Sequence, residues 1–149
     1  MKRLSYALAV ILALVGIATP SMAAEKSKEH HIVFQVDQND PAVMNLVLNN
    51  VQNMLEYYNG KGEPAKIEVV AFGPGLNMLR DDKSPVKDRI AEAKAAVPNL
   101  ALSMCNNAKM AAEKREGITI KPMAGVKVVP AGIVRLMELQ ELGWTYIRP

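Results

Sequence analysis

Short segments rich in β-branched residues alternate along this chain with segments of helical periodicity, and this alternation limits the possible folds more than any other feature. Strands that alternate with helices lie parallel in the sheet, and the crossovers between them are right-handed. The sequence therefore predicts an α/β domain in which helices cover both faces of a mostly parallel sheet. The predicted strands are residues 31–36, 65–72, 100–104, 125–129 and 144–148.

Polar caps and prolines mark where the first two helices begin. Asp40 can cap a helix that Pro41 opens, and Ser84-Pro85 repeats the same signal before a narrow apolar stripe. The predicted helices are residues 41–59, 85–97, 108–114 and 130–142, with a short turn at 76–79.

The first 23 residues have the three-part pattern of a secretory signal peptide. Met1-Lys2-Arg3 is positively charged, residues 4–18 carry no charge, and the small residues Ser21 and Ala23 precede the expected cut. The apolar stretch is shorter than the ~20 residues that span a bilayer, and an uncleaved anchor is the alternative interpretation. We expect residues 24–149 to form one exported, periplasmic domain with no stable membrane anchor after cleavage.

Cleavage would change the charge of the protein. Removing Lys2 and Arg3 lowers the formal net charge from +3 to +1, which is too small for a nucleic-acid partner. A single cysteine excludes an internal disulfide and a Cys-rich zinc site. The sequence has no cofactor-binding fingerprint and no ligand cluster with metal-site spacing, so neither a cofactor nor a metal is predicted.

Ligands of such sheets bind beyond the carboxyl ends of the strands, and three loops of this chain are expected there. The first contains Asn39 and Asp40, the second is Gly73-Pro74-Gly75, and the third is Cys105-Asn106-Asn107. Gly73 to Gly75 can line a pocket or bring its backbone close to an anion. A plain turn, the usual place for Gly and Pro, is the alternative.

Cys105 is the strongest single candidate for a chemically reactive residue. It stands where a strand is expected to end and a helix to begin, and the amides of a helix N-terminus stabilise a thiolate. A chain with no second cysteine can carry sulfur as a persulfide or pair with a partner's thiol. A buried cysteine that packs as a small apolar residue is the alternative, and position alone leaves both open.

Several other charged or polar residues are interpreted as solvated. Neighbours on a strand point to opposite faces, so His30 and His31 make a poor chelating pair and are predicted to form a solvated turn. Asp81-Asp82 and the run from Glu113 to Glu116 are interpreted as surface charge.

The mature chain resembles the exported branch of the DsrE/DsrF-like family over residues 30–149. The resemblance implies a three-layer α/β/α fold with a five-stranded parallel sheet, assembly into homo-oligomers, and a cysteine that carries persulfide sulfur between proteins. Cys105 matches that cysteine, whereas Ala108 stands where many relatives have threonine. The resemblance rests on six segments that occur in the same order as in the family: Asn39-Asp40-Pro41, 48–51, 69–76, Cys105-Asn106-Asn107, 126–132 and 143–149.

The leading hypothesis is a periplasmic protein that binds or relays sulfur through Cys105, at most a sulfurtransferase-like enzyme, with a sulfur donor or acceptor protein as partner. Amides near Asn106 and Asn107 would stabilise the thiolate or persulfide, Gly73 to Gly75 would shape the neighbouring wall, and Asn39-Asp40 would share the same sheet edge. The alternative is a non-catalytic, homo-oligomeric binding module in which Cys105 only packs. A thiol-dependent hydrolase or oxidoreductase has no supporting base, second cysteine or cofactor motif.

Overall fold

The computed structural model describes residues 28–97 and 99–149, and the predicted signal peptide lies outside this part of the chain. The strands and helices alternate as the sequence predicts. In chain order they are β1 (His30–Val36), α1 (Pro41–Gly60), β2 (Ala65–Ala71), the 3-10 helix η1 (Gly73–Leu79), α2 (Lys87–Ala96), β3 (Leu100–Cys105), α3 (Asn106–Glu116), β4 (Lys127–Val129), α4 (Gly132–Glu141) and β5 (Thr145–Ile147).

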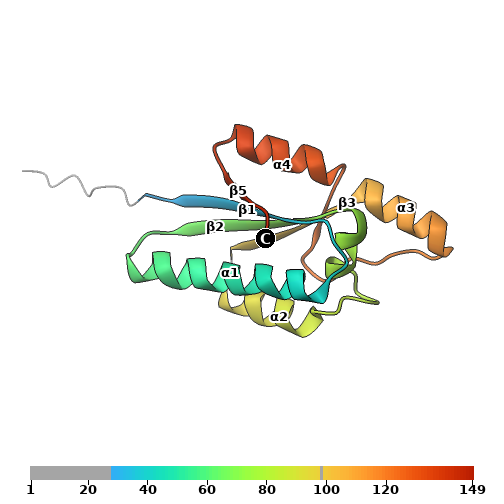
Figure 1. The fold of residues 1–149 in the computed structure, drawn as a ribbon, viewed down its shortest axis with the longest axis horizontal. Helices are drawn as coiled ribbons and strands as arrows, with labels where there is room; N and C mark the ends of the chain where they lie inside the picture. Colours follow the sequence, from blue (N-terminus) through green and yellow to red (C-terminus); the bar gives the residue numbers. More distant parts are fainter. Residues whose placement is uncertain (1–27, 98) are drawn as a thin grey trace, which may run out of the picture.

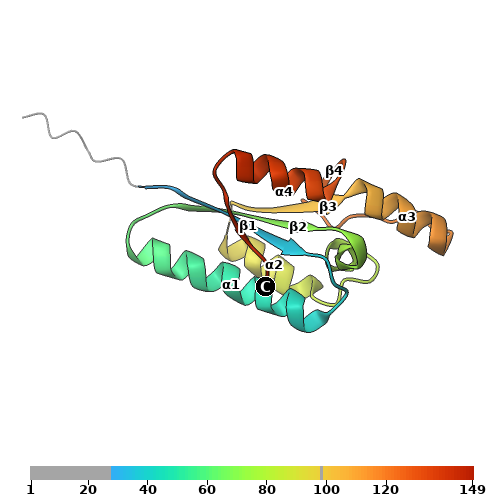
Figure 2. The same ribbon diagram turned by 45° about the horizontal axis from the view of Figure 1, so that its top comes forward.

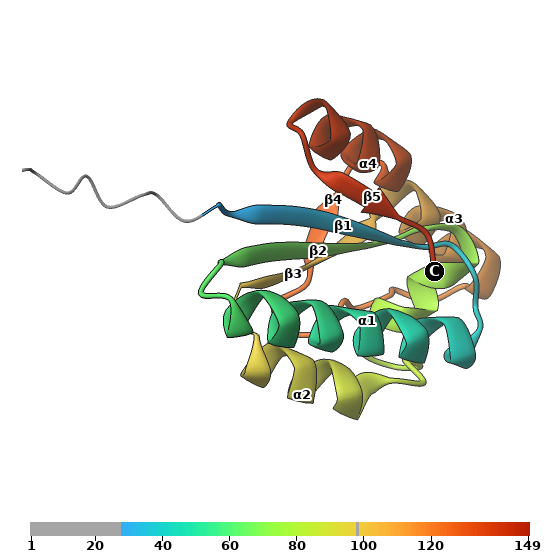
Figure 3. The same cartoon turned by 60° about the vertical axis from the view of Figure 1, so that its left-hand side comes forward.

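The five strands form one sheet in the order β4-β3-β2-β1-β5, and every neighbouring pair is parallel. The chain adds β2, β3 and β4 on one side of β1 and then returns to place β5 on the other side. α1 and α2 cover one face and α4 covers the opposite face (Figure 1, Figure 3), while α3 lies beyond the end of β3 (Figure 2). The predicted three-layer α/β/α fold with a five-stranded sheet is confirmed.

Strand alternation divides the core between the two faces of the sheet. On the side of α1 and α2, Phe34 and Leu102 belong to a large cluster of buried side chains. On the side of α4, a smaller cluster contains Val33, Val70 and Leu136. α4 is also tied to the sheet by an ion pair, because Arg135 donates to both carboxylate oxygens of the buried Glu68, at 2.8 and 2.7 Å.

Three local predictions were wrong. α2 begins at Lys87 rather than Pro85, because the Ser84 hydroxyl donates to the Met78 carbonyl at 2.5 Å and closes a turn. Cys105-Asn106-Asn107 is not a loop, because β3 ends at Cys105 and α3 begins at Asn106. His30 does not lie in a solvated turn, because it opens β1 and stacks on the Tyr58 ring with centroids 3.8 Å apart.

Of the helices that the structure describes, none has the length and apolar character needed to cross a bilayer.

Candidate functional site

A hollow of about 370 Å³ lies between η1 and α3, beyond the carboxyl ends of β1, β2 and β3. The connections that follow these three strands all contribute to it, as expected for ligand sites of parallel sheets. Asn39, Gly73 and Pro74 are the sequence-predicted candidates among its lining residues. The complete lining is Asn39, Gly73, Pro74, Leu76, Asn77, Ala108, Ala111, Ala112 and Arg115.

The Gly-Pro-Gly segment has two glycines with different structural tasks. Gly73 has a φ of +53°, which L side chains rarely adopt, so it allows the chain to turn from β2 into η1. A Cβ atom on Gly75 would lie 2.2 Å from the carbonyl oxygen of Val36, so only glycine lets η1 pack on the end of β1. Gly73 and Pro74 therefore line the hollow, whereas Gly75 is buried against the sheet.

Cys105 is not among the residues that line the hollow. It is the N-cap of α3, and its Sγ accepts a hydrogen bond from the Ala108 amide at 3.4 Å. The side chain is buried, with 6% of the residue exposed. In the register of β3 and β4, Ser103 pairs with Lys127 and Cys105 pairs with Val129. Ser103 and Cys105 are two positions apart on the strand, so their side chains point to the same face of the sheet. That face is the α4 side, since Ser103 donates to the Glu68 carboxylate there.

The remaining candidates lie in the connections but not in the lining of the hollow. Asp40 is the N-cap of α1, and its carboxylate accepts from the Ala42 amide at 2.8 Å. Asn106 donates to the Met110 sulfur at 3.4 Å, and the Asn107 amide donates to the Pro130 carbonyl at 3.3 Å. These contacts give Asp40, Asn106 and Asn107 structural partners within the chain.

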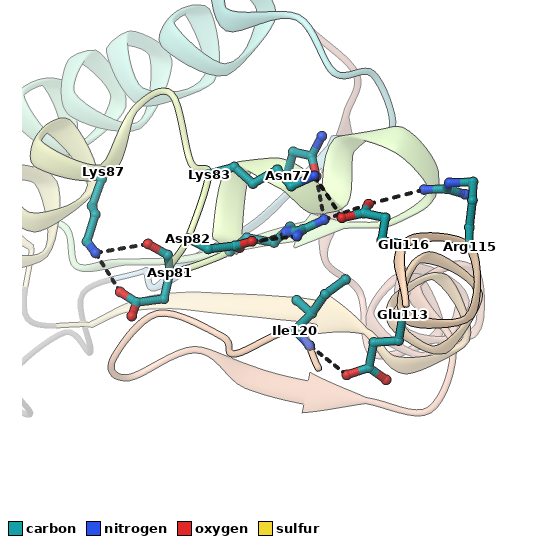
Figure 4. A network of polar contacts seen from close by, with 10 residues as sticks. Asn77, Asp81, Asp82, Lys83, Lys87, Glu113, Arg115, Glu116 and Ile120 are labelled. Atoms are coloured by element: carbon teal, nitrogen blue, oxygen red, sulfur yellow. Dashed lines mark hydrogen bonds and ion pairs between the residues drawn. The ribbon is translucent and has the colours of Figure 1, made fainter. Parts of the chain in front are cut away.

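A network centred on Arg80 is the feature that sequence reasoning missed (Figure 4). The Arg80 side chain is fully buried and makes two hydrogen bonds to Asp82, at 2.9 and 2.6 Å. It also donates to Glu116 at 2.9 Å and to Asn77 at 3.4 Å, so it joins η1 to the end of α3. Glu116 was interpreted as solvated surface charge, and that interpretation was wrong, because only 21% of its side chain is exposed. Asp82 lies at the surface as interpreted, with 44% of its side chain exposed, although its carboxylate is paired with Arg80.

The network shifts the ionisation of its members. The hydrogen bond from Arg80, with a further one from Lys83, lowers the pKa of Glu116 to about 2. The Arg80 guanidinium likewise holds the pKa of Asp82 below its ordinary value. Both carboxylates are therefore charged at neutral pH and keep Arg80 neutralised in its buried position.

Other charged residues do not gather into a metal site. Within residues 28–97 and 99–149, no group of three or more His, Cys, Asp or Glu side chains is close enough to hold a metal ion.

The fold defines a parallel α/β protein of three layers, and comparison with solved structures gives a relative. The chain is similar to protein MTH1491 from Methanobacterium thermoautotrophicum, described as a protein of unknown function, with a TM-score of 0.69 and 30% sequence identity. The match covers 80% of this chain and 99% of that chain. The protein thus belongs to the same family as MTH1491. No family model matches the sequence. No curated protein matches it either.

Proposed function

We propose that this is a DsrE/DsrF-like protein that binds or relays sulfur through Cys105. The observation that carries the proposal is the hydrogen bond from the Ala108 amide to the Cys105 sulfur at the start of α3. A backbone amide and the positive end of a helix both favour negative charge, on a thiolate or on the terminal sulfur of a persulfide. The amide supplies this contact although Ala108 has no hydroxyl group.

The expected reaction is a transfer of one sulfur atom. The Cys105 thiolate attacks a terminal sulfur of a polysulfide chain, a new S–S bond forms as the adjacent S–S bond breaks, and the shortened polysulfide leaves with the electron pair. Because only 6% of Cys105 is exposed, the reaction requires the segment after β4 to move away from the start of α3, which leaves the bond from the Ala108 amide to the sulfur in place. The bond from the Asn107 amide to the Pro130 carbonyl, 3.3 Å long, is a contact that this movement breaks.

Mass spectrometry of the intact protein tests this proposal. After incubation with polysulfide, we expect a mass increase of about 32 Da that is absent in Cys105→Ser and is removed by a reducing agent. Because Cys105 is the single cysteine of the sequence, no other thiol of the chain can account for the added mass. An unmodified wild-type protein, under conditions that load a known sulfur carrier, contradicts the proposal.

A non-catalytic, homo-oligomeric module is the second candidate, and the exposed apolar face of α4 favours it. Ile133 and Met137 are 57% and 54% exposed, and Val134 beside them is also exposed. Such a patch is typical of a surface covered by another copy of the chain. In this case Cys105 only packs, reacts slowly with thiol reagents in the folded state, and Cys105→Ser lowers stability.

The oligomeric state is measured by sedimentation velocity. We expect Met137→Lys to shift the protein toward monomer, because a lysine in a buried interface loses hydration. Asn53→Lys, which adds the same charge to an exposed position of α1, is the control and leaves the state unchanged. A monomeric wild type, or equal effects of both variants, refutes the role of the α4 face.

Export to the periplasm remains part of the proposal. The expected cut after Ala23 is tested by N-terminal sequencing of the protein from the periplasmic fraction of a bacterial host. A protein that keeps Met1, or that stays in the cytoplasm, contradicts it.

A further inference from the structure

We propose that the hollow between η1 and α3 binds a small organic monoanion, namely a carboxylate with a compact apolar body. This site is additional to the proposed sulfur chemistry, because Cys105 does not line it. Its volume of about 370 Å³ lies at the lower end of the range for small-molecule sites, which favours a ligand with few atoms.

The walls of the hollow supply the apolar part of the site. Leu76 contributes from η1, and Ala108, Ala111 and Ala112 contribute from α3. Residues spaced by three and four positions share one face of a helix, so the three alanines form a single shallow wall. Because their side chains are small, they leave open the space that a larger residue would fill.

Arg115 supplies the charge. Its side chain is 71% exposed at the rim, and its contact with Glu116 is 3.6 Å long. The same carboxylate is held more closely by Arg80 at 2.9 Å and by Lys83 at 2.7 Å. The network has three cations against two carboxylates, Asp82 and Glu116, which leaves one positive charge in excess. Arg115 is its least neutralised cation and can therefore pair with an anion.

Asn77 and the two walls of the hollow are held in place before any ligand arrives. Arg80 donates both to Asn77 in the η1 wall and to Glu116 at the end of α3, so the buried guanidinium fixes the spacing of η1 and α3. Asn77 accepts this bond through its oxygen, and its NH₂ group remains a donor for a carboxylate oxygen. A site whose walls are already ordered loses little entropy on binding.

Two other hollows fit an anion less well. The groove between α1 and α2, about 310 Å³, is lined by Glu56 and Glu92 with Arg89 as its cation. Arg89 already donates to Asn45 and Asn49, at 2.8 Å each. Two carboxylates against one engaged cation disfavour a negative ligand. The third hollow, beside β4 and α4, measures about 140 Å³, which is too small for the proposed class.

Nuclear magnetic resonance of the full, ¹⁵N-labelled chain tests the proposal with three probes. Phenylacetate carries both charge and apolar body, phenylacetamide has the same shape without the charge, and acetate has the charge alone. We expect phenylacetate to shift the amide signals of Gly73, Leu76, Ala108 and Ala111 in a saturable way. Phenylacetamide binds more weakly by up to about five-fold, the upper end of what one exposed ion pair contributes. Acetate gives no saturable shift at these positions.

Two variants separate the contributions of shape and charge. Ala111→Leu fills the hollow and abolishes the phenylacetate shifts at Gly73 and Leu76, whereas Ala95→Leu, the same change at an exposed position of α2, leaves them intact. Arg115→Gln removes the preference for the acid over the amide while the protein stays folded, because its side chain is at the surface. Shifts that do not saturate, that map to the α1–α2 groove, or that persist in Ala111→Leu overturn the proposal. A preference for the acid that survives in Arg115→Gln overturns it as well.

Discussion

Replacing Glu68 by glutamine tests whether the ion pair beneath α4 holds that helix on the sheet. Glu68 lies in β2 with 3% of its surface exposed, and its two oxygens accept from Arg135 at 2.8 and 2.7 Å. Ser103 donates a third hydrogen bond at 2.6 Å. Glu68→Gln keeps the size of the side chain but removes the negative charge and one acceptor oxygen.

We expect the free energy of unfolding to fall by about 2 kcal/mol in Glu68→Gln. Two hydrogen bonds to a charged acceptor, about 1.5–3 kcal/mol each, become at most one bond from the guanidinium to a neutral amide oxygen, so roughly one charged bond is lost. The value stays below the roughly 3–5 kcal/mol for breaking a fully buried pair, because the Arg135 side chain is 24% exposed and keeps some hydration. At about 4 °C per kcal/mol for a domain of this length, Tm falls by about 8 °C.

The same variant has a predicted pH dependence. Burial raises the pKa of Glu68, but the hydrogen bonds from Arg135 and Ser103 outweigh it, so the pKa lies below its ordinary value of 4.5. A carboxylate whose pKa is lower in the folded protein than in the unfolded chain stabilises the fold at pH values above its unfolded pKa. This stabilisation is lost as the pH falls through the pKa of the folded state. The stability difference between wild type and Glu68→Gln is thus complete at neutral pH and shrinks below pH 4.5.

Urea unfolding followed by circular dichroism, at pH 7 and between pH 3 and 4, measures both effects. Glu138→Gln is the control, because this exposed carboxylate is 3.7 Å from the same guanidinium. We expect the control to change the stability by less than about 0.5 kcal/mol. Equal losses in the two variants, or a Glu68→Gln difference that does not change with pH, would refute the reasoning.

Three further predictions concern the connections around the hollow. Gly75→Ala should lower the free energy of unfolding, measured in urea, by about 3 kcal/mol, because the added Cβ meets the backbone of β1. Gly60→Ala is the control and should lower it by nothing, because a Cβ there has no atom within 4 Å. Equal effects of the two changes contradict the packing argument. Asp40→Ala should lower stability by about 1 kcal/mol through loss of the α1 cap, and an unchanged urea midpoint rules out that role. Glu116→Gln should reduce the loss of stability on acidification between pH 4.5 and about 2, the range over which its lowered pKa stabilises the wild type; identical acid unfolding curves refute this.

The sheet could be predicted from sequence because each strand and helix has its own local pattern. α4 shows what a local pattern cannot predict. Its periodicity predicts a helix, and Leu136 and Leu139 are indeed buried on the sheet. The same pattern cannot show that Ile133 and Met137 stay exposed, because this depends on how much of the helix one sheet face can cover.

Arg80 could not have been recognised as buried from its neighbours. It precedes Asp81 and Asp82, and a run of charges normally indicates a solvated surface. Its burial depends on Glu116, 36 residues away, because only two carboxylates together compensate a guanidinium that has left water. Nothing local to either segment marks this pairing, so the network beside the hollow could not be predicted, whereas Gly73 and Pro74 in its lining could be predicted from their turn pattern.

The orientation of Cys105, in contrast, follows from a rule that can be applied to the sequence. Side chains along β3 point alternately to the two faces of the sheet. The large apolar core contains Leu100, Leu102 and Met104, so residues 101, 103 and 105 face away from it, and Cys105 with them. The hollow lies on the other side, since its Leu76 and Ala112 belong to that core. A protein that exchanges sulfur with Cys105 is therefore expected to approach from the α4 side, where exposed apolar side chains are available for contact. If so, Met137→Lys should slow sulfur transfer between proteins while leaving direct loading by polysulfide unchanged.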